Sequence, residues 1–99
     1  MSEQVKIKEV RNRLMQYLDT LYPSPVQLAT LFKSMVYLYD DYELVLFKKD
    51  IAYLAAKDYI EYVDEKIGGV GKFLKKVVRL TAVGKEIAEK TQTDPALEI

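Results

Sequence analysis

The stretch from Leu46 to Gly84 places the strongest constraint on the fold of this chain. It begins with LFKKDIAYLAAKDYIEYVDEK, in which a helical periodicity changes to a strand-like pattern after Asp58. The glycine-rich segment IGGVGKF follows, and a second strand-like run leads into LTAVG, where another helix is expected to begin. The stretch therefore predicts the order helix, hairpin, helix.

Two further helices are expected before this stretch. Apolar residues recur at steps of three and four between residues 4 and 21, which is the pattern of an amphipathic helix. The members of this apolar face are Ile7, Val10, Leu14, Leu18 and Leu21. Ser24 and Pro25 then supply an N-cap and a first-turn proline for a second helix. Its expected buried face consists of Leu28, Leu31, Phe32, Met35 and Val36.

The helix predicted over residues 43–57 has two faces of different character. Asp41 is a candidate cap for this helix. Its expected buried face consists of Leu44, Phe47, Ile51, Leu54 and Ala55. The opposite face carries Lys49, Tyr53, Ala56 and Lys57, and Lys48 lies at its side. This outer face is the first candidate for contact with a partner.

The hairpin is predicted from strands over residues 60–65 and 73–80, with a tip at 68–71. Thr81 is expected to cap a last helix over residues 82–90. Val83 and Ile87 are expected to face the core, and residues 91–99 are predicted to form a short irregular tail.

The composition favours binding over catalysis. The chain has no cysteine and no histidine, which removes disulfides, thiolate ligands and the most common general base. Acidic pairs such as Asp40 and Asp41 are adjacent, and adjacent side chains do not converge on one site. We therefore expect no enzyme activity, no metal site, no cofactor and no small-molecule substrate.

The length and hydropathy predict one domain over residues 1–99. The first residues, MSEQVKIKEVRN, are charged and lack the apolar core of a signal peptide. No apolar run approaches the roughly 20 residues that are needed to span a bilayer. A cytoplasmic protein without membrane contact is expected.

The formal net charge is zero, but the charges are unevenly distributed. Residues 40–65 contain three bases and eight acids, whereas residues 66–79 contain five bases and no acid. The five bases are Lys66, Lys72, Lys75, Lys76 and Arg79. A basic hairpin of this kind suits a phosphate backbone. Alternatively, its lysines protect an exposed strand edge, or are neutralised by Glu61, Asp64 and Glu65 on the opposite strand.

Three short motifs resemble those of a known family. DIAYL (50–54), DYI (58–60) and LTAVG (80–84) are similar in order and spacing to the pattern of winged helix-turn-helix domains. That pattern often has glycine where this chain has Asp58, and aspartate tolerates left-handed backbone angles better than most residues. Gly84 would let the last helix approach its neighbours closely.

Most of the chain also resembles small uncharacterised winged-helix proteins of Mu-like phages and prophages. The resemblance implies an α+β fold that is mainly α: a three-helix core, a two-stranded β-hairpin wing and a C-terminal helix. A winged helix-turn-helix pattern makes double-stranded DNA the first partner to consider, through a recognition helix at about 43–57. The charge distribution adds a basic wing at 66–79. The candidate DNA-binding residues are Lys48, Lys49, Tyr53, Lys57, Lys72, Lys75, Lys76 and Arg79.

Two alternatives remain open at this point. A winged-helix module that binds another protein and no DNA fits the same pattern, because a fold does not determine a function. Tyrosines such as Tyr37, Tyr39 and Tyr42 suit packing or a protein interface. A homodimer formed through the first helix is equally compatible with the sequence.

Overall fold

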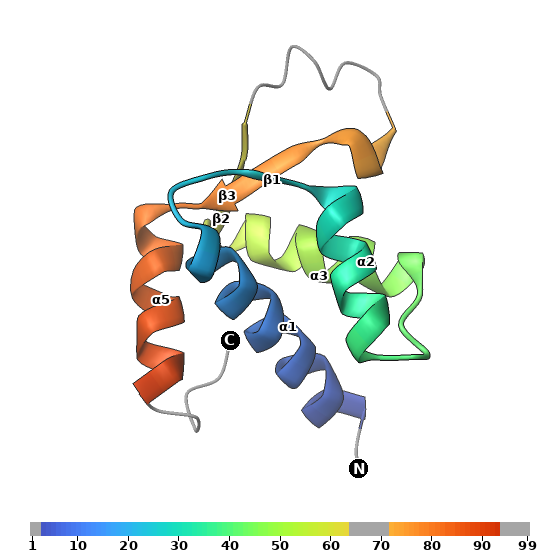
Figure 1. Cartoon of the computed structure of the whole chain (residues 1–99). Helices are drawn as coiled ribbons and strands as arrows, with labels where there is room; N and C mark the ends of the chain where they lie inside the picture. The colour runs from blue at the N-terminus through green and yellow to red at the C-terminus, as the bar shows by residue number, and fades with distance from the viewer. Residues whose placement is uncertain (1–2, 64–71, 94–99) are drawn as a thin grey trace.

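The computed structural model describes residues 3–63 and 72–93, with side chains described for residues 7–63 and 72–90. Within these ranges the chain forms four α-helices, one short 3-10 helix and a three-stranded antiparallel sheet. The elements are α1 (Glu3–Leu21), β1 (Val26–Gln27), α2 (Leu28–Leu38), α3 (Leu44–Ala56), β2 (Ile60–Val63), η1 (Phe73–Lys75), β3 (Val77–Leu80) and α5 (Ala82–Thr93). Figure 1 shows α1, α2 and α3 on one side of the sheet and α5 beside α1.

The architecture is α+β and mainly helical, which confirms the predicted fold class. The sheet has the strand order β1-β3-β2, so it contains one strand more than the predicted two-stranded hairpin. None of the described helices is both long and apolar enough to cross a bilayer.

Helix α1 buries the face that its periodicity predicts. Val10, Leu14 and Leu18 are buried, and so is Met15, which the predicted spacing does not include. Ile7 is 38% exposed, in contrast to its predicted place on the buried face. Because α1 packs against α2, β3 and α5, a wide part of its circumference lies inside the protein.

The segment after α1 is a strand, where the sequence predicts the start of a helix. Strand β1 pairs antiparallel with β3. The Leu28 N–H group donates to the Lys76 carbonyl at 2.8 Å, so this pairing continues to the first residue of α2. The prediction that Ser24 and Pro25 begin the second helix is therefore wrong. The extended conformation is stabilised by main-chain hydrogen bonds from β3, a partner that is distant in the sequence.

Helix α3 lies within the predicted range, but it begins without a side-chain cap. Glu43 is its N-cap residue and makes no side-chain capping bond. The prediction that Asp41 caps this helix is therefore wrong. The inner face carries the buried side chains Phe47, Ile51 and Leu54, as predicted. Leu44, which was assigned to the same face, is 37% exposed.

A left-handed turn at Asp58 ends α3. The backbone angle φ of Asp58 is 63°. The Tyr59 N–H group donates to the Leu54 carbonyl, and the Asp58 N–H group donates to the Ala55 carbonyl, both at 3.0 Å. These two bonds define a Schellman motif, which normally uses glycine at the left-handed position. The expected left-handed aspartate is confirmed, and the turn directs the chain into β2.

The returning limb of the hairpin is a strand only in its second half. Strand β3 begins at Val77, whereas residues 73–75 form the 3-10 helix η1. The Phe73 ring packs edge-on against the Phe47 ring, with centroids 5.8 Å apart. This packing brings η1 against α3, so the prediction of a continuous strand from residue 73 is wrong. The predicted glycine tip lies in residues 64–71, outside the described residues.

Helix α5 begins as predicted and continues further. The Thr81 Oγ1 atom accepts a hydrogen bond from the Gly84 N–H group at 3.0 Å, which confirms the predicted cap. The helix extends to Thr93, so the first residues of the predicted irregular tail are helical, and the remainder lies outside the described residues. Val83, which was predicted to face the core, is 46% exposed, so that prediction is wrong. Ile87 is partly buried against the core, as predicted, and Ala88 is fully buried.

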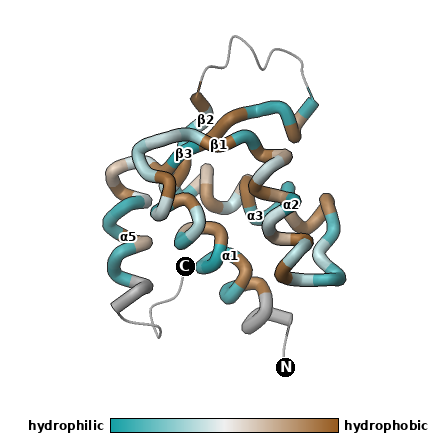
Figure 2. The backbone as a smooth tube through the Cα atoms, in the orientation of Figure 1, coloured by the Kyte–Doolittle hydropathy of each residue, from teal (hydrophilic) through white to brown (hydrophobic). Residues whose placement is uncertain are grey.

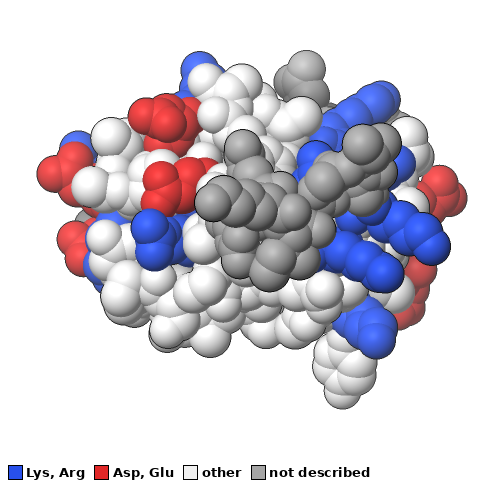
Figure 3. Space-filling view, turned by 90° about the horizontal axis from the view of Figure 1, so that it is seen from above, with Lys and Arg blue, Asp and Glu red and all other residues white. Residues whose placement is uncertain are grey.

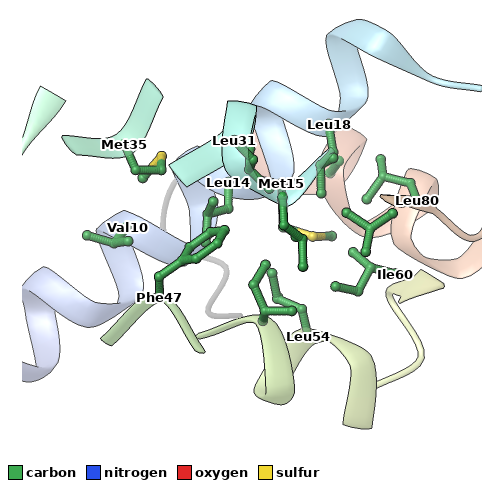
Figure 4. Close-up of a cluster of buried hydrophobic side chains, with 14 of the residues drawn as sticks. Val10, Leu14, Met15, Leu18, Leu31, Met35, Phe47, Leu54, Ile60 and Leu80 are labelled. Carbon is green, nitrogen blue, oxygen red and sulfur yellow. The ribbon is translucent and has the colours of Figure 1, made fainter. Parts of the chain in front are cut away.

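The core joins all four helices to the sheet. Figure 2 shows hydrophobic and hydrophilic residues alternating around α1, as expected for a helix with a buried face. In Figure 4 the Phe47 ring of α3 projects toward Leu14 of α1. The buried hydrophobic residues are Val10, Leu14, Met15, Leu18, Leu28, Leu31, Met35, Tyr42, Phe47, Ile51, Leu54, Ile60, Val78, Leu80 and Ala88.

Candidate nucleic-acid interface

Helix α3 presents an outer face of lysines around small apolar side chains. Lys48, Lys49 and Lys57 are exposed, and so are Val45 and Ala52 between them. No arginine, asparagine or glutamine occurs in α3, so the helix lacks the planar guanidinium and amide groups that fit the edges of guanine and adenine. Lysine can contact phosphate or guanine acceptors, and small apolar side chains can contact a thymine methyl group.

An open groove of about 600 Å³ brings Lys48 together with two lysines that precede β3. Its basic members are Lys48, Lys72 and Lys75, and its other lining residues are Gln27, Ala29, Leu44, Phe73 and Leu74. The Lys48 Nζ atom lies 5.6 Å from the centroid of the Phe73 ring. Figure 3 shows basic side chains gathered on one side of this face of the molecule. Three cations from two separate elements therefore surround one depression.

Lys49 lies on a different side of α3. It lines a second cavity, of about 310 Å³, between α1 and α3. The other lining residues of this cavity are Ile7, Val10, Arg11, Asp41, Tyr42, Leu46 and Asp50. Lys49 is exposed, but it does not line the groove that Lys48 lines.

The positive charge of Arg79 is offset by a cross-strand partner. Arg79 of β3 lies opposite Glu61 of β2, and its Nε atom donates to the Glu61 Oε1 atom at 2.8 Å. For Arg79, the alternative of neutralisation by Glu61 on the opposite strand is therefore confirmed. Lys76 is partly buried, and its Nζ atom lies 5.2 Å from the centroid of the Tyr62 ring. The corresponding expectations for Lys66, Asp64 and Glu65 concern positions outside the described residues.

Tyr53 is packed against α1 and does not stand free on the outer face. The Arg11 guanidinium carbon lies 3.8 Å from the centroid of the Tyr53 ring. The Lys57 Nζ atom lies 5.7 Å from the same centroid. One face of this ring is therefore already occupied by a cation, in a cation–π arrangement.

A buried polar network of Arg11, Tyr42 and Asp50 lies behind α3, and the sequence pattern did not predict it. Asp50 is 5% exposed. Its Oδ1 atom accepts from Arg11 Nε at 3.0 Å, and its Oδ2 atom accepts from the Tyr42 hydroxyl at 2.6 Å. Asp50 lies three residues after Phe47 and four before Leu54, so its position on the buried side of the helix was a usable signal.

The Tyr42 hydroxyl is expected to keep its proton well above the pH at which an exposed tyrosine ionises. Burial strongly raises the pKa of Tyr42, and the hydrogen bond to Asp50 raises it further. Below about pH 10, the folded and unfolded chains both hold this proton, and the stabilisation is fully present. Above that pH the unfolded chain releases it, so the free energy of unfolding should fall by about 1.4 kcal/mol per pH unit for one tyrosine.

Urea unfolding between about pH 8 and about pH 11 measures this loss. In Tyr42→Phe the free energy of unfolding should decline less steeply with pH than in the unmodified chain. Burial also raises the pKa of Tyr62, so Tyr62→Phe is a control that should keep the Tyr42 contribution. An unchanged decline in Tyr42→Phe would contradict the assignment.

No protein-family model, curated protein or solved structure matches this chain. Among the described residues, no three acidic side chains converge on a position that could hold a metal ion. The resemblance to winged-helix proteins of Mu-like phages stays a prediction, and a functional proposal depends on the geometry of the residues themselves.

Proposed function

We propose that this chain is a winged-helix protein that binds duplex DNA. The element order α1-β1-α2-α3-β2-β3-α5 and the strand order β1-β3-β2 support a winged helix, with α3 as the recognition helix and the β2–β3 hairpin as the wing. In related helix-turn-helix modules the second helix of the motif lies in the major groove. The wing is then placed to contact the phosphate backbone.

The observation that carries the proposal is the shared groove. Lys48 projects from α3, whereas Lys72 and Lys75 belong to the segment that leads into β3, and all three line the same depression. Cations that approach from two elements can neutralise phosphates of one strand while α3 faces the bases. Three phosphate contacts correspond to a slope of about −2.7 in a plot of log affinity against log salt concentration.

The composition of α3 suggests that such binding has little sequence selectivity. Its exposed side chains can contact guanine through lysine or thymine methyl groups through Val45 and Ala52, but α3 has no guanidinium or amide group to read guanine or adenine with a fixed planar geometry. Binding in the range of about 10⁻⁴ to 10⁻⁶ M at physiological salt is typical of contacts made mainly to phosphate.

Fluorescence anisotropy with a short labelled duplex, at salt concentrations from about 50 to about 200 mM, tests the proposal. Lys48→Gln, Lys72→Gln and Lys75→Gln should each weaken binding to all sequences and reduce the magnitude of the salt slope by about 1. Lys90→Gln, which removes one exposed charge from α5, is the matched control and should change neither quantity.

Two results would contradict the proposal. The first is undetectable binding by the unmodified chain at the lowest salt concentration. The second is equal binding by the three groove variants and the control. A module that binds protein and no DNA is the second candidate, because exposed apolar side chains gather where α2 passes into α3. That candidate would be favoured by the first result.

A further inference from the structure

Exposed apolar side chains concentrate at the end of the molecule where α2 passes into α3. Tyr37 is 87% exposed and Leu38 is 51% exposed, both in the last turn of α2. Leu46, across the connecting loop, is 41% exposed. Figure 2 shows hydrophobic residues at both ends of the connection between α2 and α3 and hydrophilic residues within it. A tyrosine with so little cover has no role in the core, and aromatic side chains of this kind are enriched at interfaces.

The part of the first helix whose side chains are described offers no comparable surface. Its apolar residues Val10, Leu14, Met15 and Leu18 are buried in the core of the same chain. Its exposed side chains in the range described are Ile7, Glu9, Arg13 and Thr20. Apart from Ile7 this surface is polar, so residues 7–21 of α1 lack the apolar face that a dimer through the first helix would need.

Opposite charges flank Tyr37. Lys33 is exposed and lies four residues before Tyr37, so both side chains are on the same face of α2. Asp40 is exposed and lies three residues after Tyr37, just beyond the end of the helix. We name Lys33, Tyr37, Leu38 and Asp40 the α2-end patch. Its centre is apolar, with a cation on one side and an anion on the other.

We propose that a second copy of this chain docks on the α2-end patch, with the two α2 helices antiparallel and a two-fold axis near Tyr37. In this arrangement Lys33 of each copy, about 6 Å before Tyr37 along the helix axis, lies opposite the loop of the other copy that carries Asp40. The patch is therefore self-complementary in charge. A two-fold interface needs such self-complementarity, because the same surface lies on both sides, whereas binding to an unrelated protein does not.

The size of the patch predicts a weak, reversible dimer. A tyrosine buries about 150–250 Å², whereas a standard interface buries about 800 Å² on each partner. None of the four patch residues lines the groove of Lys48, Lys72 and Lys75, so this association leaves that groove open. The inference does not depend on DNA binding.

Sedimentation equilibrium without DNA, at protein concentrations from about 10 µM to about 1 mM, tests the proposal. The unmodified chain should approach twice the monomer mass within this range. Tyr37→Ser should weaken self-association at least about tenfold. Val83→Ser removes an exposed apolar side chain of α5 and is the matched control, which should associate like the unmodified chain. Circular dichroism verifies that each variant is folded.

Charge reversal supplies a test that is independent of the apolar contact. Lys33→Glu and Asp40→Lys should each weaken association, because each sets like charges against one another. The double variant Lys33→Glu with Asp40→Lys should restore it. A chain that stays monomeric at every concentration would overturn the proposal, even if the patch then bound another protein. Failure of the double variant to recover association would also overturn it.

Discussion

Replacing Arg11 with alanine is expected to lower the free energy of unfolding by about 3–5 kcal/mol. The carboxylate of Asp50 is almost fully buried, and the Arg11 Nε atom lies 3.0 Å from its Oδ1 atom. Without the guanidinium, the buried Asp50 carboxylate would still accept the hydrogen bond from the Tyr42 hydroxyl, but it would have no cation beside it. The Tyr53 ring would lose the cation that covers it. Since domains of this kind are stable by only about 5–15 kcal/mol, a loss of this size approaches unfolding.

Urea denaturation followed by circular dichroism measures this loss. Arg13→Ala is the matched control, because Arg13 is exposed on the same helix, and it should cost less than about 0.5 kcal/mol. A variant that replaces Arg11 and Asp50 with leucine and Tyr42 with phenylalanine should recover much of the stability, because neither an unpaired charge nor an unpaired buried hydroxyl remains. If Arg11→Ala were as stable as Arg13→Ala, the ion pair would contribute nothing to holding α3 against α1.

Gly84→Ala is the second substitution with a large expected effect, a loss of about 3 kcal/mol or more. A Cβ atom at this position would lie 1.9 Å from the Tyr59 carbonyl oxygen and 2.8 Å from its carbon. Both are main-chain atoms, and the oxygen also accepts a hydrogen bond from the Thr81 N–H group at 3.0 Å. Relief of the overlap therefore requires that α5 move away from the turn after α3.

The sign of the change in stability tests the close approach of α5, because glycine-to-alanine changes inside helices ordinarily stabilise by about 0.5–1 kcal/mol. Ala82→Gly, at the exposed first position of the same helix, is the control and should cost at most about that amount. Thermal unfolding of both variants compares the two effects. A Gly84→Ala variant as stable as the unmodified chain would show that α5 does not approach the turn as closely as the structure indicates.

The parts of the fold that depend on local chemistry were predictable from the sequence. The apolar spacing of α1 and α3 predicted most of their buried residues, because helical periodicity places such residues on one side. Ile7 and Leu44, at the start of these faces, are exposed. The left-handed Asp58 and the Thr81 cap were also predictable, since each depends on the backbone preferences of one residue and its close neighbours.

The placement of the candidate DNA-binding residues was predictable only in part. Exposure of Lys48, Lys49 and Lys57 follows from the helical pattern. The sequence could not show that Lys48 shares a groove with Lys72 while Lys49 lies elsewhere, because the Phe73–Phe47 contact sets the position of η1 against α3.

By itself, then, the sequence determined that this chain is mainly helical with a hairpin near its end, and where α3 ends and α5 begins. Only the tertiary structure decided that residues 26–27 form a third strand, that Arg11 and Tyr42 neutralise and bind Asp50, and that the basic groove is built from two elements. The physical reason is the distance along the chain between the partners. Hydrogen bonds and ion pairs between such segments leave no periodic pattern in either one, and they form only when packing brings both segments together.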